Sequence, residues 1–215
     1  MDLPDISGVN IVLLGSFNPA IFHPIWFKTQ NLIRAQEADD AKIEIIHPEV
    51  SSFSTDWCKI VVMTNRFSGE TLSSSHFEPL RDLVFGTFSI LEHTPVSKMG
   101  LNRLLHYKMP SLESWHGVGH LLAPKDPWKT VMSEPGLLSL VMQDKRDDPP
   151  GYTRAKVEPS SRVIPGVYIE INNHYEFKEQ TGSSLHNFME ILKNSWENII
   201  NFSDKIAHHL ISQGY

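Results

Sequence analysis

An apolar seam in the last thirty or so residues restricts the fold of this chain most strongly. Between Ser183 and Ser212 the seam residues recur alternately every four and three positions, and only Ser203 among them is polar. They are Leu185, Met189, Leu192, Trp196, Ile199, Ser203, Ile206 and Leu210. Four more apolar residues widen this face beyond a two-helix seam: Phe188, Ile191, Ile200 and Phe202. The pattern predicts a long helix lying across a sheet, with a coiled-coil dimer as the alternative. A dimer that uses the surplus apolar face stays open.

The first half of the chain alternates between strand and helix patterns. Runs that are apolar or alternate between polar and apolar predict strands at residues 9–14, 42–46, 57–64 and 99–109. Helices are predicted at 24–36 and at 75–91, where Ser75 and Glu78 have the spacing of a capping box. The order β-α-β-β-α-β predicts a ferredoxin-like first half, with its first and third strands inside the sheet.

The second half is less regular. Three further strands are predicted, at residues 136–143, 152–158 and 166–177. The segment 111–132 contains two internal prolines and is expected to hold only short helices. We therefore expect an α+β fold in which these strands extend a mostly antiparallel sheet. A single domain over residues 1–215 is favoured, and two halves, 1–109 and 110–215, are the alternative.

Composition limits the classes of function. The 215 residues are 40% hydrophobic, which is enough for a large core, and the net charge of −6 argues against general nucleic-acid binding. The acidic N-terminal segment does not resemble a signal peptide, and no apolar run approaches the roughly 20 residues of a membrane helix. A cytoplasmic protein without membrane contact is expected. Cys58, the single cysteine, lies in an apolar run and is interpreted as a buried, inert thiol.

The stretch from residue 15 to residue 24 resembles the start of the nucleotidyltransferase superfamily. The family's strand-end turn is matched by Gly15, Ser16, Phe17, Asn18 and Pro19. In that family a His-x-Gly-His-type motif follows and binds the triphosphate at a helix N-terminus. Here no Gly-His pair directly follows His23, and the family's Ser-Thr-x-Arg/Lys signature near the C-terminal end is missing.

This resemblance implies a nucleotide site made of Gly15, Ser16, Asn18 and His23. We favour a plain backbone turn instead, because Asn-Pro pairs make turns and Pro24 suits the first position of a helix. Nucleotide binding at this turn is kept as the alternative function.

Two histidines four residues apart, His116 and His120, could share one face of a helix and bind zinc. Two glycines between them weaken such a helix, and Glu113 does not sit inside the pair as a metalloprotease motif requires. A third ligand would have to come from elsewhere in the chain, for example from His106 or His174. No metal and no cofactor are therefore predicted.

Two predicted strands both carry a His-Tyr pair near their ends. If these strands are neighbours, their polar and aromatic residues could converge on a peptide or a small ligand. The candidate ligand-binding residues are Arg103, His106, Tyr107, Asn172, His174 and Tyr175. The alternative is an ordinary pair of strands with one wet face.

The same two strands and the last helix resemble a sporadically distributed bacterial family of uncharacterised α+β proteins, over residues 55 to 213. The family's Gly-Leu-Arg-Tyr-type strand corresponds to Gly100, Leu101, Asn102 and Arg103, and its Ile/Leu-Asp-Ile-Asp-type strand to Ile169, Glu170, Ile171 and Asn172. Asn102 and Glu170 depart from these patterns. The resemblance implies no known activity, and the family's distribution is compatible with a mobile-element or phage-defence context.

No complete set of catalytic residues can be assembled from these motifs. We therefore expect a protein that works by binding a protein partner or its own copy, rather than by catalysis.

Overall fold

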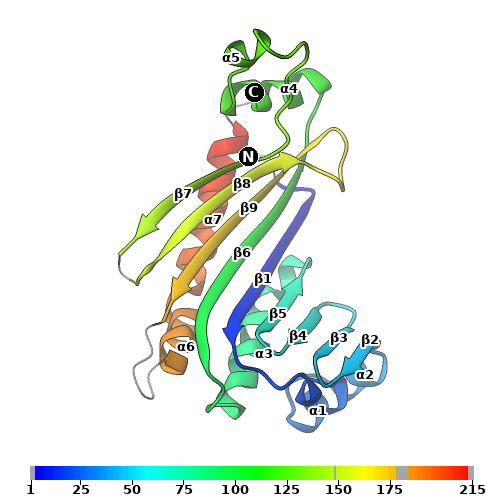
Figure 1. Ribbon diagram of the computed structural model, residues 1–215. Coiled ribbons are helices and arrows are strands. Elements are labelled where there is room, and N and C mark those ends of the chain that lie inside the picture. Colours follow the sequence, from blue (N-terminus) through cyan, green and yellow to red (C-terminus); the bar gives the residue numbers. More distant parts are fainter. Residues whose placement is uncertain (1–2, 148, 178–183, 213–215) are drawn as a thin grey trace.

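The computed structural model describes residues 3–147, 149–177 and 184–212, and its centre is one antiparallel sheet (Figure 1). The sheet contains β1 (Ile6–Gly15), β2 (Lys42–His47), β3 (Val50–Ser54), β4 (Lys59–Met63), β5 (Arg66–Thr71), β6 (Val96–Lys108), β7 (Leu140–Arg146), β8 (Gly151–Pro159) and β9 (Gly166–Glu176). Its nine strands have the order β2-β3-β4-β5-β1-β6-β9-β8-β7. Strands from residues 1–109 and 110–215 therefore pair within one sheet.

The helices are α1 (Pro24–Thr29), α2 (Ala35–Asp39), α3 (Phe77–Ile90), α4 (Leu112–Leu122), α5 (Asp126–Lys129), α6 (Ser184–Asn194) and α7 (Trp196–Ser212), with single 3₁₀ turns at Pro19–Ile21 and Ser74–His76. The helices α1, α2 and α5 are short, with four to six residues each, and α3, α4, α6 and α7 are longer. In Figure 1, α3, α6 and α7 lie on one face of the sheet, and α4 and α5 form a lobe beyond one end of it. Within the described residues, no helix lies on the opposite face of the sheet in this view.

The structure shows a mixed fold with a large antiparallel sheet, but it does not confirm the ferredoxin-like arrangement of the first half. In that arrangement the first and third predicted strands are parallel neighbours. Here β5 lies between β1 and β4, and pairs antiparallel with both. The sequence prediction lacked β3 and β5, because both are short and interrupted by serine or glycine.

Two predicted helix details differ from the structure. The helix expected at 24–36 is split into α1 and α2, and Asn31 between them has a φ of 57°, a left-handed conformation that asparagine tolerates. The capping box of Ser75 and Glu78 is wrong: the N-cap of α3 is His76, without a side-chain hydrogen bond.

The C-terminal helical segment is present as two helices separated at Ser195. The main-chain hydrogen bonds continue through this break, because Ser195 N donates to Ile191 O (2.9 Å) and Ile199 N donates to Ser195 O (3.0 Å). The expected first residue, Ser183, lies outside the described residues. The buried face of α7 carries Trp196, Ile199, Ser203, Ala207 and Ile211.

Two hydrophobic clusters lie under these helices. One joins β1, β4, β5 and β6 to α3 and α6, and the aromatic ring of Phe88 is at its centre. The other joins β6, β8 and β9 to α4 and α7, with Val118 and Ile211 among its members. None of the helices in the described ranges is both long and apolar enough to cross a membrane.

Candidate functional site

The two strands expected to share a ligand site are indeed neighbours. β6 and β9 pair antiparallel, with His106 opposite Tyr168. However, successive side chains of a strand point to opposite faces, so the six predicted residues fall into two groups. Those on the helix-covered face are Arg103, Tyr107 and Tyr175, and those on the uncovered face are His106, Asn172 and His174.

On the helix-covered face, Arg103 anchors α7 to the sheet. Its side chain is buried, and its Nε lies 2.8 Å from Asp204 Oδ1 on α7 in an ion pair. Its Nη1 donates to the main-chain oxygen of Gly8 (2.9 Å), and the guanidinium lies 4.7 Å from the ring centroid of Phe77. Burial, together with the Asp204 carboxylate, raises the pKa of Tyr107 to about 12. These contacts indicate a structural role for Arg103 and Tyr107.

On the uncovered face, a polar row crosses six strands at one register. It consists of Glu70, Asn10, Asn102, Asn172, Arg154 and Gln143, each opposite the next. Asn10 Nδ2 donates to Glu70 Oε2 (3.1 Å), Asn172 Nδ2 donates to Asn102 Oδ1, and Arg154 Nη2 donates to Gln143 Oε1 (2.7 Å). Each side chain of the row therefore has a hydrogen bond to another member of the row.

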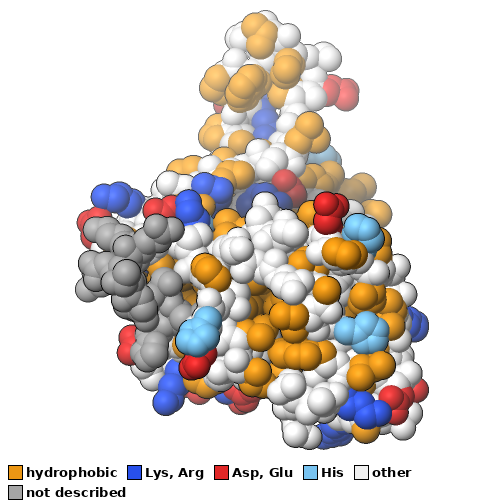
Figure 2. Space-filling view, turned by 60° about the horizontal axis from the view of Figure 1, so that its bottom comes forward, with side chains coloured by type: hydrophobic (Ala, Val, Ile, Leu, Met, Phe, Trp, Pro, Cys, Tyr) orange, Lys and Arg blue, Asp and Glu red, His pale blue; other side chains and the backbone are white. Residues whose placement is uncertain are grey.

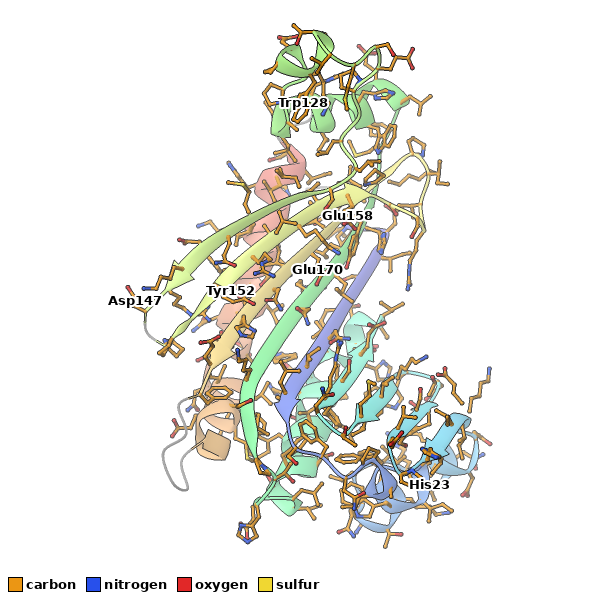
Figure 3. The ribbon with its side chains drawn as sticks, in the orientation of Figure 1. His23, Trp128, Asp147, Tyr152, Glu158 and Glu170 are labelled. Carbon is orange, nitrogen blue, oxygen red and sulfur yellow. The ribbon has the colours of Figure 1, made fainter. Side chains whose placement is uncertain are left out.

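Stacked aromatic pairs flank this row. Tyr168 stacks on His106 with ring centroids 4.6 Å apart, and Tyr152 stacks on His174 at 4.5 Å. Figure 3 shows Tyr152 and Glu170 along this part of the sheet. Burial lowers the pKa of His106, with a further contribution from the positive charge of Arg162. For His174, burial lowers the pKa more than the neighbouring carboxylate raises it. Both shifts favour the neutral form of the imidazole.

The charged groups on this face are paired as well. The Lys156 ammonium lies 3.0 Å from Glu170 and 3.4 Å from Glu158. Burial opposes the charged form of Lys156, but the hydrogen bond and charge of Glu170 outweigh this effect and raise its pKa. Such internal pairing explains how a broad sheet face can remain exposed to water, and it favours a structural role over catalysis.

The turn that resembles a nucleotidyltransferase uses its polar groups locally. Asn18 Oδ1 accepts from Ala20 N (3.2 Å), and His23 Nδ1 accepts from Ile25 N (3.1 Å), so each side chain caps a helical turn. A Cβ atom on Gly15 would collide with the main-chain oxygen of Pro95, which explains the glycine. The Ser16 main-chain N–H also donates to that oxygen (3.0 Å). These contacts favour the backbone-turn interpretation.

A capping role for His23 has a measurable consequence. Replacing His23 by alanine should lower the free energy of unfolding by about 1 kcal/mol, because the Ile25 N–H loses its acceptor. His23→Asn keeps a side-chain acceptor and should recover most of this loss. Urea denaturation of the three proteins measures the difference, and equal stability of the alanine variant and the wild type would contradict the capping role.

Cys58 does not offer a reactive thiol. Its side chain is buried, and burial raises its pKa to about 11. Because the thiolate is the nucleophilic form, Cys58 is inert at neutral pH, as its apolar neighbours in the sequence indicated.

A hollow of the described surface lies beside α4, in a segment that the sequence predicted only as a place for short helices. Ser111 Oγ accepts from Ser114 N (3.1 Å) and caps α4, while Trp115 Nε1 donates to Gly166 O (2.9 Å) and ties α4 to β9. The hollow between α4, segment 134–138 and the ends of β8 and β9 has a volume of about 780 Å³, and we call it the α4–β8 groove. Its apolar lining includes Trp115, Val118, Leu137, Leu138, Val157 and Val167.

Ionisable side chains also line this groove. Glu113, His116, His120, Lys125, Glu134 and Glu158 contribute to it. His116 and His120 do share one side of α4, with ring centroids 6.2 Å apart. Within residues 3–147, 149–177 and 184–212, no three His, Cys, Asp or Glu side chains form a group that could hold a metal ion.

Around the groove, the lobe exposes large apolar side chains. We call the exposed residues Leu112, Leu121, Trp128, Val131, Met132 and Leu138 the apolar lobe. Val131 and Leu138 are 78% and 83% exposed. Hydrophobic side chains gather on the lobe at the top of Figure 2, and Figure 3 shows Trp128 beyond the end of the sheet.

Comparison with known proteins identifies no family for this chain. No protein-family model matches the chain, and no curated protein matches it.

Proposed function

We propose that this protein works by binding another protein, or a second copy of itself, through the apolar lobe. The observation that carries the proposal is the exposure of the six lobe residues, above all Val131 and Leu138. Contiguous apolar surface on a folded protein commonly marks an interaction site. Tryptophan and methionine, both present in the lobe, are enriched at protein interfaces.

The apolar lobe, rather than the apolar face of the predicted C-terminal helix, supports the proposed interaction. Most of the apolar face of α7 is packed against the sheet, and Phe202 is its one large apolar side chain in the described residues that is exposed, at 49%. The long helix therefore stabilises the fold, and the support for an interaction surface comes from residues 112–138.

The proposal keeps two expectations from the sequence. The partner is a protein rather than nucleic acid, since the chain carries a net charge of −6. The setting is the cytoplasm, in line with a single, buried cysteine.

A pair of matched variants tests the proposal. Val131→Ser/Leu138→Ser removes apolar groups from the lobe, and Leu3→Ser/Ile25→Ser removes comparably exposed groups elsewhere. Light scattering after size exclusion measures self-association against the chain mass of 24.5 kDa, and affinity capture from cells that naturally contain the protein measures hetero-association. We expect association of the wild type and of the Leu3/Ile25 variant, and its loss in the lobe variant.

Two outcomes would contradict the proposal. One is a wild type that stays monomeric at high concentration and captures no protein. The other is a lobe variant that associates as strongly as the wild type.

A further inference from the structure

The α4–β8 groove combines an apolar floor with an acidic rim. Val118, Val157 and Val167 are buried in the floor, whereas Glu113 and Glu134 are exposed and line the same hollow. The described lining residues include three carboxylates but only one ammonium group. The carboxylates are those of Glu113, Glu134 and Glu158.

The ammonium group is that of Lys125, and it has a structural role. Lys125 is buried, and its Nζ donates to the main-chain oxygen of Gly119 near the end of α4 (3.2 Å). A cation at this position suits the negative end of the helix dipole. Lys125 therefore stabilises α4 and leaves the exposed rim acidic.

Glu158 is only partly neutralised. Its Oε1 accepts from Ser139 Oγ (2.9 Å), and its Oε2 lies 3.4 Å from the Lys156 ammonium, which is closer to Glu170. In the described residues, neither Glu113 nor Glu134 has a basic side chain within ion-pair distance. The rim thus presents negative charge to any segment that enters the groove.

From this charge pattern we infer that the α4–β8 groove binds a basic amphipathic helix of a partner protein. The inference rests on the proposed function and names the chemistry of the partner. Leucine-like side chains of the helix lie on Trp115, Val157 and Leu138, and its Lys or Arg side chains face Glu113 and Glu134. A helix fits better than an extended strand. A helix docks through its side chains, which can contact the side chains that line the groove, whereas an extended strand binds by pairing with a free strand edge.

The volume of the groove agrees with this occupant. About 780 Å³ lies within the range of about 300–1,000 Å³ typical of ligand sites, so several anchor side chains can enter together. The exposed apolar residues continue outside the groove, at Leu112 and Leu121, which favours a macromolecular partner over a small amine.

Two synthetic peptides of about 20 residues provide the probe. Both have the same leucine face, but one carries Lys and Arg on its polar face and the other carries Glu. Fluorescence anisotropy with the full chain measures their affinities. We expect the basic peptide to bind about tenfold tighter or more at low salt, with the difference shrinking toward 1 M salt because the rim charges are screened.

Matched charge-reversal variants test whether the rim carboxylates cause the preference for the basic peptide. Glu113→Lys/Glu134→Lys changes the rim. Glu49→Lys/Glu92→Lys makes the same change of net charge at exposed positions in two turns elsewhere in the chain. The rim variant should lose about tenfold in affinity for the basic peptide, and the control should lose much less. Circular dichroism verifies that both variants are folded.

The results separate this inference from the proposed function. Equal binding of the two peptides, or equal losses in the two double variants, would overturn the acidic-rim inference and leave apolar docking intact. Binding of neither peptide would also overturn it, while the capture experiment with the Val131/Leu138 variant decides the proposed function independently.

Discussion

Replacing Arg103 by alanine should lower the free energy of unfolding by about 3 kcal/mol, the low end for breaking a buried ion pair. The side chain of Arg103 is only 6% exposed, and it bonds β1 through Gly8 O and α7 through Asp204. Because the Asp204 side chain is 42% exposed, water relieves part of the cost of leaving its carboxylate alone. Equilibrium denaturation in urea measures the loss.

A double-mutant cycle shows whether this loss belongs to the pair. Asp204→Ala should cost about 3 kcal/mol or more, because it leaves the buried Arg103 guanidinium without its counter-charge. The double variant should cost less than the two single changes together. If Arg103→Ala costs under about 0.5 kcal/mol, as most surface substitutions do, Arg103 does not anchor α7 and a ligand role becomes credible again.

Replacing Phe88 by alanine should have the largest effect in the chain, about 4 kcal/mol. Phe88 is fully buried on α3, and its ring contacts Phe67 on β5 and Phe188 on α6, with centroids 5.2 and 5.7 Å away. Its removal leaves a cavity where a helix from the first half of the chain, a strand and a C-terminal helix meet. Thermal or urea unfolding measures the change.

Phe202 supplies the matched control. It is an aromatic residue on α7 that is 49% exposed, so Phe202→Ala should cost about 1 kcal/mol or less. Similar losses in the two variants would mean that Phe88 is not at the centre of the core.

Much of the β6–β9 region could be predicted from the sequence. The two strands, and the possibility that they are neighbours, follow from their apolar patterns and their His-Tyr ends. Alternation along a strand also separates His106 from Arg103 and Tyr107, since odd and even positions face opposite sides. The sequence predicts a helix across the sheet but not which face of β6 and β9 it covers. That choice of face makes Arg103 an anchor for α7 and places His106 on the opposite face.

Other parts of the fold, among them β5 and the apolar lobe, could not be predicted from the sequence. β5 contains Ser68 and Gly69 and shows no long apolar run, so only its pairing with β1 and β4 reveals it as a strand. The apolar residues of the lobe lie between prolines with no clear period. A sequence pattern cannot show that Val131 and Leu138 remain exposed, because exposure depends on what the rest of the fold leaves uncovered.

Site-specific photo-cross-linking tests the central claim, that the apolar lobe binds a protein, most directly. A photoreactive amino acid is placed at Leu138 in one protein and at Ile25 in another, and both are irradiated in living cells. The account predicts a cross-linked protein adduct from position 138, with little or none from position 25. No adduct at 138, or equal adducts at both positions, would contradict it.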